Sequence, residues 1–351
     1  MLHASIISAT LRLPGGSHRP ASERIAGPAP PATRGQPTYV SPERELYVGE
    51  IRDAVMSCGL KCPRCGGDEI VRYGKRNGAQ RYMCKLCRRT FTDFTGTVLH
   101  GLRRRELWLE FCKCLMEGIT VREAARRLGI SKNTSFEWRH RAIAALASAD
   151  SSEKCQGIVE LAQLPMLRSF KGCSVPAEAE MQHVKPTFRR HHRAYSRFLP
   201  RVRVISMVVA VDRAGRARAV VAPRGENLTP TLSELIVRDA QVCAPVFGSR
   251  FRFGAGWPGG LNWVGAHGGR RRLVGRVAAG PLYHVRNANR LIHYFVEWMR
   301  RFCGVATKYL LRYFSWYLRR MALTAAGPTV AAKLLLLEVL SAGAGAVGQR
   351  Y

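Results

Sequence analysis

Acidic side chains are scarce in this sequence. Across 351 residues, 24 Asp and Glu stand against 56 Lys and Arg, which gives a formal net charge of +32. A protein with that imbalance attracts polyanions, so double-stranded DNA is the first candidate partner. The alternative is a generally basic surface that binds anions without specificity.

The sequence also lacks a long apolar run and a secretory signal. The apolar stretch near the end of the chain is interrupted by Lys333 and Glu338, and no run elsewhere is long enough to span a bilayer. Without a secretory signal, the 11 cysteines are expected in a reducing compartment, where thiols bind metal rather than form disulfides. We therefore expect a soluble, cytoplasmic, DNA-associated protein without a membrane partner.

Two CxxC pairs dominate the first third of the chain. Cys62-Pro-Arg-Cys65 and Cys84-Lys-Leu-Cys87 have the separation of a site in which four thiolates hold Zn²⁺. The arm between them predicts a strand, a turn at Asn77-Gly78 and a second strand. Over 46–100 we therefore expect a zinc ribbon with one structural Zn²⁺. Buried free thiols or a redox pair are the alternatives. The predicted metal ligands are Cys62, Cys65, Cys84 and Cys87.

Three helices are predicted over 101–150. The first covers 103–118, the second begins at the N-cap Thr120, and the third begins at Lys132 after the turn Gly129-Ile130-Ser131. Two helices joined by such a turn are typical of a helix-turn-helix, whose second helix enters the major groove of DNA. An ordinary three-helix bundle with a basic face is the alternative. The predicted DNA-contacting residues are Lys132, Asn133, Thr134, Ser135, Trp138 and Arg139.

The remaining segments follow from composition and periodicity. Residues 1–45 are rich in Pro, Gly, Ser and Arg and are expected to be a disordered extension. Over 155–322, strands at 157–162, 202–223 and 241–247 alternate with helical segments, which predicts a mixed α/β domain. The fold class is therefore α/β, and residues 323–351 are expected to form a C-terminal tail.

Several runs recur in one known family. They are Cys62–Cys87, the helix pair, Gly157-Ile-Val-Glu160, Ser169-Phe-Lys-Gly172, Val211-Asp-Arg-Ala-Gly215, Tyr283-His-Val-Arg-Asn-Ala-Asn289 and Trp298-Met-Arg-Arg-Phe-Cys-Gly-Val-Ala-Thr-Lys-Tyr309. With these runs the chain resembles the zinc-ribbon insertion-sequence transposases of the ISXO-like group over about 60–322. The resemblance implies an RNase H-like domain of the DDE type, which cuts and joins DNA with two Mg²⁺ ions. Carboxylates hold such ions because Mg²⁺ prefers oxygen ligands.

The catalytic positions that the resemblance implies are Ala162, Phe247 and Asn289, so the two expected aspartates are replaced. Candidate substitute carboxylates are Glu160, on the strand face of Ala162, and Asp239. From residue 155 onward there are two aspartates, and the other one, Asp212, is expected in a hairpin turn.

His284 is expected to be a hydrogen-bonded structural histidine rather than a metal ligand. Three hypotheses remain open: a transposase-family protein that binds transposon ends without catalysis, an active transposase with substitute carboxylates, and a zinc-ribbon transcriptional regulator. A homo-oligomer on DNA is compatible with the first two.

Overall fold

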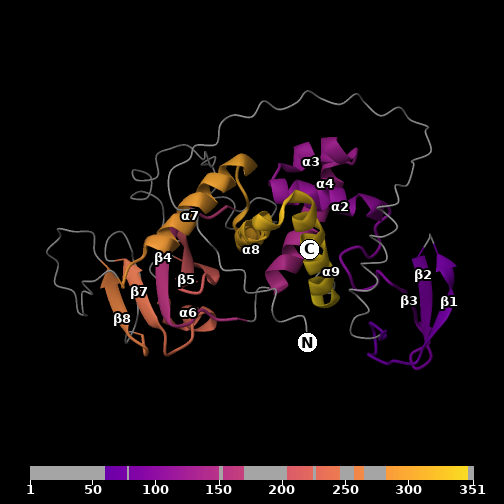
Figure 1. Ribbon diagram of the computed structural model, residues 1–351, viewed down its shortest axis with the longest axis horizontal. Coiled ribbons are helices and arrows are strands. Elements are labelled where there is room, and N and C mark those ends of the chain that lie inside the picture. The colour runs from indigo at the N-terminus through magenta and orange to yellow at the C-terminus, as the bar shows by residue number, and fades with distance from the viewer. Residues whose placement is uncertain are drawn as a thin grey trace, which may run out of the picture. The chain divides into compact units, whose positions relative to one another are not determined.

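The computed structural model describes residues 60–76, 79–149, 153–169, 204–223, 227–245, 257–264 and 282–346. They divide into two units, which are described in turn (Figure 1). The smaller unit holds the described residues before Leu107 apart from Gly96–Val98, and the larger unit holds the rest. The predicted extension at 1–45, residues 46–59 of the predicted ribbon and the Asn77-Gly78 turn lie outside the described residues.

The smaller unit is a three-stranded antiparallel sheet of β1 (Ile70–Arg76), β2 (Ala79–Cys84) and β3 (Thr90–Thr92). Strands β1 and β2 pair from Ile70 with Cys84 to Arg76 with Ala79, as the predicted strand-turn-strand arm requires. The core is small and consists of Cys62, Tyr82, Cys84 and Phe91. A core of this size contributes little stability, and domains this small commonly gain more from a metal or a disulfide.

The larger unit begins with three helices, α2 (Trp108–Glu117), α3 (Val121–Leu128) and α4 (Lys132–Ala149). The first helix was predicted from residue 103, but residues Arg105–Leu107 form a 3-10 turn, η1, and the α-helix starts after it. The predicted caps are present: the Thr120 hydroxyl accepts from the Glu123 N–H at 3.3 Å, and the Ser131 hydroxyl accepts from the Thr134 N–H at 3.0 Å. These hydroxyls satisfy N–H groups that have no partner within the helix.

A five-stranded mixed sheet follows, with the strand order β6-β5-β4-β7-β8. Strands β6, β5 and β4 are antiparallel neighbours, whereas β4, β7 and β8 run parallel. The strands are β4 (Ile158–Leu167), β5 (Val204–Asp212), β6 (Ala217–Pro223), β7 (Gln241–Pro245) and β8 (Leu261–Val264). The sequence had predicted a mixed α/β arrangement but not β8, whose four residues carry no marked alternation.

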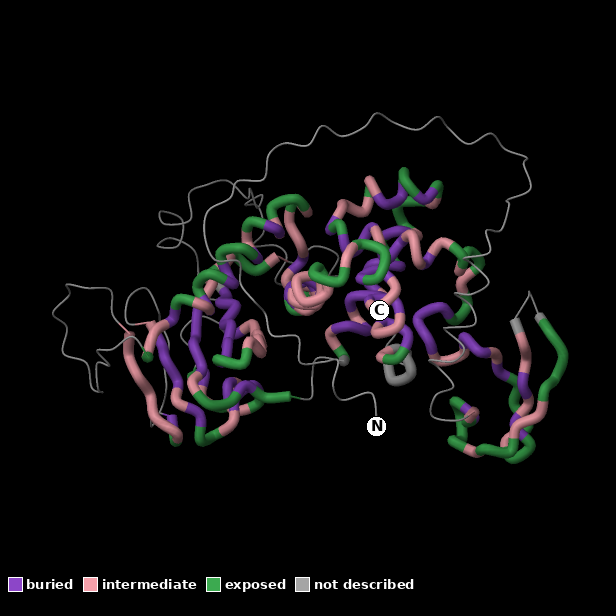
Figure 2. The backbone as a smooth tube through the Cα atoms, in the orientation of Figure 1, coloured by how far each residue is buried: buried purple, intermediate pink, exposed green. Residues whose placement is uncertain are grey.

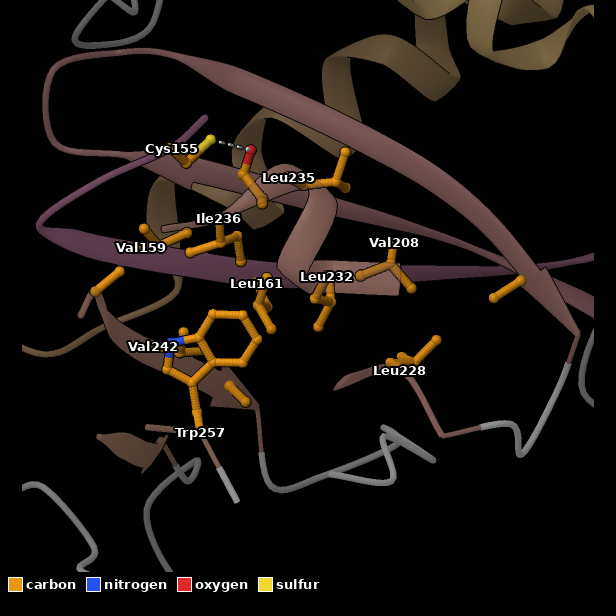
Figure 3. Close-up of a cluster of buried hydrophobic side chains, with 14 residues drawn as sticks. Cys155, Val159, Leu161, Val208, Leu228, Leu232, Leu235, Ile236, Val242 and Trp257 are labelled. Atoms are coloured by element: carbon orange, nitrogen blue, oxygen red, sulfur yellow. Dashed lines mark hydrogen bonds between the residues drawn. The ribbon is translucent and has the colours of Figure 1, made fainter. Parts of the chain in front are cut away.

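Both faces of the sheet are covered, as the buried stretches along its central strands indicate (Figure 2). On one face, alternate residues of β4, β5 and β7 pack with α6 (Thr229–Leu235) and Trp257 in a single apolar cluster (Figure 3). On the other face, α7 (Arg286–Met299) packs against β4 and β5. Side chains alternate along a strand, so Glu160 and Ala162 point to the α7 face while Val159 and Leu161 join the cluster.

The chain ends in helices that return to the first three. After the short turns η3 (Arg300–Phe302) and η4 (Thr307–Tyr309), α8 (Leu310–Leu323) packs against α4. A further turn, η5 (Thr324–Ala326), leads to α9 (Pro328–Ala346), which packs against α2 and α4. The prediction of a C-terminal tail over 323–351 was therefore wrong, because Ala332, Leu335 and Leu336 of α9 are buried.

The end of α2 is the junction between these two groups of helices. Its last carbonyls accept hydrogen bonds from side chains that follow them by slightly more than 200 residues. Trp316 Nε1 donates to the Leu115 carbonyl at 3.1 Å, and Arg320 Nε donates to the Met116 carbonyl at 2.6 Å. The Arg320 guanidinium suits this position because the carboxyl end of a helix carries partial negative charge.

No helix among the described residues is long and apolar enough to cross a membrane. The longest one, α9, carries Lys333 and Glu338 within its apolar sequence.

Candidate metal centre and nucleic-acid interface

The two CxxC turns have the same backbone geometry. The Cys62 N–H donates to the Gly67 carbonyl at 2.8 Å, and the Cys84 N–H donates to the Arg89 carbonyl at 3.1 Å, five residues further along in both cases. The residue after the second cysteine has a positive φ in each turn, 74° at Gly66 and 53° at Arg88. The two turns therefore have equivalent backbone shapes, and each can present its two thiols in the same way.

The four thiols meet at one point. The Sγ atoms of Cys62 and Cys87 are 3.6 Å apart, as are those of Cys65 and Cys84, and all four lie within 4.8 Å of one another. A tetrahedral zinc with Zn–S bonds of about 2.3 Å requires sulfur–sulfur distances of about 3.8 Å. The four cysteines can therefore hold a zinc ion, as predicted from their spacing.

The thiols differ in acidity in the absence of a cation. Burial raises the pKa of Cys62, but the backbone N–H groups of Cys65 and Arg64 outweigh this effect and lower the pKa to about 7. At Cys65 the Gly67 N–H lowers the pKa, yet the neighbouring thiols, Cys84 foremost, raise it to about 12. Four sulfurs this close cannot all ionise unless a cation balances their charge.

The predicted DNA-contacting residues of α4 fall into two sets. Lys132 and Asn133 are exposed in the first turn, and Thr134 is half-buried. Ser135, Trp138 and Arg139, by contrast, are 0%, 2% and 1% exposed. These three side chains cannot reach DNA from a packed core, so the prediction was wrong for them. The turn before α4 has the expected shape, with Gly129 at φ 60°.

Arg139 shows what replaces the predicted contact. Its Nη2 donates to the Ile119 carbonyl at 2.6 Å, and its guanidinium lies 5.5 Å from the ring centre of Phe302 and 5.2 Å from that of Trp316. Ser135 similarly donates to the Val121 carbonyl at 3.0 Å. These residues hold α4 against the preceding helices and the end of the chain.

Glu160 is the carboxylate nearest to the implied catalytic position on β4, and it is 1% exposed. Its Oε2 accepts from the backbone N–H groups of Asn287 at 2.7 Å and Ala288 at 3.2 Å, in the first turn of α7. The N-cap residue Val285 has no side-chain oxygen, so Glu160 caps α7 from the neighbouring strand.

The other oxygen of Glu160 is also occupied. Oε1 accepts from Asn287 Nδ2 at 2.8 Å and lies 2.7 Å from Arg213 Nη1 and 3.2 Å from His284 Nδ1. Arg213 Nη1 in turn lies 3.0 Å from His284 Nε2. His284 is thus hydrogen-bonded, as predicted, whereas its structural role stays a prediction. We name this group of four residues the α7 clamp: Glu160, Arg213, His284 and Asn287.

Of the other two implied positions that the structure describes, Ala162 lies beside Glu160 and Asn289 does not reach it. Ala162 lies on the same face of β4, is fully buried and offers no donor atom. Asn289 is exposed on α7, and the amide that reaches the strand belongs to Asn287, two residues earlier. Phe247 lies outside the described residues, because the described part of β7 ends at Pro245.

The two aspartates lie elsewhere. Asp239 precedes β7, whose first residue pairs with Ile158 at the start of β4. Ala162 is four residues further on, or about 13 Å of strand, so the register does not bring Asp239 to it. Asp212 closes the β5–β6 hairpin as predicted, with its carboxylate accepting from the Arg216 N–H at 2.9 Å and from Arg216 Nε at 2.9 Å.

Comparison with known proteins gives a partial match. The chain is 29% identical over 116 residues to an uncharacterised protein in the transposable element ISH50 of Halobacterium salinarum. The match covers 32% of this chain and 39% of that protein. No family model matches the chain. No solved structure matches it either. The likeness supports a function related to a transposable element.

Proposed function

We propose that this protein is an insertion-sequence transposase-family protein that binds transposon ends and does not cut or join DNA. The observation that carries the proposal is the strand order β6-β5-β4-β7-β8, with an antiparallel meander extended by two parallel strands. This order is typical of RNase H-like domains, and the α7 face of β4 is then the face of the reaction centre. The likeness to a protein of a transposable element supports the same proposal.

DNA binding is assigned to the first part of the chain. The α3–α4 pair carries the turn of a helix-turn-helix, and α4 exposes Lys132 and Asn133 where such a helix meets the major groove. Lysine can reach phosphates or guanine, and asparagine can pair with adenine. The ribbon, with Zn²⁺ on its four thiolates, is a second basic module beside these helices in the sequence.

Catalysis would need two divalent metals held by carboxylates, and the residues present do not fit that requirement. Both oxygens of Glu160 accept hydrogen bonds from α7 or from a cation, and Ala162 has no oxygen. The Arg213 guanidinium already neutralises Glu160. We therefore assign no reaction step to Mg²⁺ at this site.

The test uses the full chain purified with its zinc. Duplex DNA carrying the terminal repeats of the element is supplied with Mg²⁺ or Mn²⁺, and both retention of the duplex and strand-transfer products are measured. We expect binding that weakens steeply with salt, and no transfer product.

Two results would contradict the proposal. Absence of binding even at low salt would remove the DNA-binding function. Transfer product that the unmodified protein forms, and that is lost in Glu160→Gln or Asp239→Asn, would show that substitute carboxylates support catalysis.

A further inference from the structure

An exposed aromatic side chain on α4 is stacked onto the C-terminal part of the chain. Phe136 is 43% exposed, and its ring centre lies 4.2 Å from that of His140 and 6.3 Å from that of Tyr309. The rings of His140 and Tyr309 are 4.0 Å apart. The turn η4, which precedes α8, therefore lies directly beside the outer face of α4.

Cations gather around this stack. Lys308 Nζ lies 5.0 Å and the Arg312 guanidinium 5.8 Å from the ring centre of Tyr309. His140 is 2% exposed, and its Nδ1 has no hydrogen-bond partner. Burial lowers the pKa of His140 to about 4, with Arg312, Arg139 and Lys308 contributing by repulsion. The imidazole thus stays neutral at pH 7 among concentrated positive charge.

The exposed residues of α4 lie on the same side as this cluster. Lys132 and Asn133 precede Phe136 by four and three residues, and residues at these spacings share one face of a helix. Glu137 is an exposed acid on the same turn. The cations of η4 and α8 therefore extend the basic edge of α4 beyond the helix itself.

We propose that these residues form one surface, the α4–η4 patch, that binds the backbone of duplex DNA; this inference rests on the proposed DNA-binding function. The patch consists of Lys132, Asn133, Phe136, Lys308 and Arg312.

Charge complementarity selects the partner. In this arrangement α4 meets the groove, while Lys308 and Arg312 contact phosphates beside it. Phe136 lies between the two sets and can contact a thymine methyl or the sugar edge. The segment of η4 and α8 then contacts DNA in addition to packing against α4. Its contacts to phosphate add affinity without sequence preference.

The experiment compares two double variants of the full, zinc-loaded chain. Lys308→Gln with Arg312→Gln removes two charges from the patch but keeps the first part of each aliphatic stem and a polar end group. The control, Lys154→Gln with Arg238→Gln, removes two charges from exposed positions on either side of α6 in the sequence. Binding of a short fluorescent duplex, carrying either the terminal repeat or a scrambled sequence, is measured over a range of salt concentrations.

Each lost phosphate contact lowers the slope of log affinity against log salt by about 0.9, so the patch variant should lose about 1.8. The same relation gives a loss of roughly 60-fold in affinity at 0.1 M salt, equal for both duplexes. The control should match the unmodified protein, and equal melting temperatures of all three proteins would show that folding is intact.

The outcomes separate the two proposals. If the unmodified protein binds and the patch variant keeps the same slope and affinity, the patch is refuted while the proposed function stands. If the control loses as much as the patch variant, charge alone matters and the patch is again refuted. If the unmodified protein does not bind duplex at any salt concentration, both proposals fail.

Discussion

The α7 clamp allows a sharp distinction between a structural carboxylate and a metal ligand, through the substitution Glu160→Ala. The change leaves the buried N–H of Ala288 without an acceptor, removes the cap of α7 and leaves Arg213 without its counterion. An orphaned buried donor costs about 1–3 kcal/mol. A lost cap costs roughly 0.5–2 kcal/mol.

The ion pair adds little to this sum, because the Arg213 side chain is 32% exposed and partly solvated. The two costs sum to about 1.5–5 kcal/mol. For a unit of this size, about 2–4 °C accompany each kcal/mol, so the melting temperature should fall by roughly 3–20 °C. A metal ligand behaves in the opposite way, because residues selected for function are often neutral or costly for stability.

The assay is thermal unfolding of the full chain, followed by circular dichroism and by hydrogen exchange of the α7 amides. Exchange at Asn287 and Ala288 should accelerate, since these N–H groups lose their acceptor. Glu160→Gln should show a smaller loss, because its amide oxygen can still accept one bond. Glu234→Ala, at an exposed glutamate of α6, is the control and should stay within about 0.5 kcal/mol of the unmodified protein. A melting temperature of Glu160→Ala equal to or above that of the unmodified protein would refute the clamp.

Three further predictions concern other parts of the chain. Metal analysis of reduced protein should find one zinc per chain, and Cys84→Ser should lose both the metal and the ribbon fold, because binding and folding are coupled; zinc-free protein with a folded ribbon would contradict this. Gly118→Ala should destabilise the protein more than Gly129→Ala in urea unfolding. Both glycines end a helix with positive φ, but a Cβ on Gly118 would lie 2.7 Å from Trp298 Nε1, whereas nothing lies within 4 Å of a Cβ on Gly129. The difference should be about 1–3 kcal/mol, and equal losses would refute the close contact. Because the pKa of His140 is lowered to about 4, the unfolded chain binds more protons than the folded chain between pH of about 6.5 and 4, and stability should fall as pH falls through this window. Thermal unfolding of His140→Phe at a series of pH values should lack that part of the pH dependence. A pH profile equal to that of the unmodified protein would contradict the lowered pKa.

Local features were predictable because neighbouring residues determine them. The caps Thr120 and Ser131 and the turn at Gly129 depend only on which residue follows which, and the spacing of the CxxC pairs is sufficient to bring four thiols together. The alternation along β4 likewise indicated that Glu160 and Ala162 share a face. Each of these inferences needed no knowledge of distant parts of the chain.

The errors have a common physical origin, which is burial by segments far away in the sequence. Arg139 and Trp138 looked like groove-facing residues because the helices that cover α4 begin more than 150 residues later. The contact between Asn287 and Glu160 could not be predicted, because only packing decides which side of a helix meets the strand. The packing of α9 was missed because its sequence is apolar throughout and shows no single face.

The return of α8 and α9 to the first helices has a consequence for synthesis of the protein on the ribosome. Helices α2 and α4 leave the ribosome early, yet the side chains that complete their core, such as Leu335 and Leu336, are made last. The whole sheet is translated in between, so the helical core closes only after the five strands have been made. A chain released early, even just after α7, would carry the complete helix pair with its apolar side uncovered. Premature termination should therefore yield an aggregating or degraded product rather than a shortened DNA-binding protein.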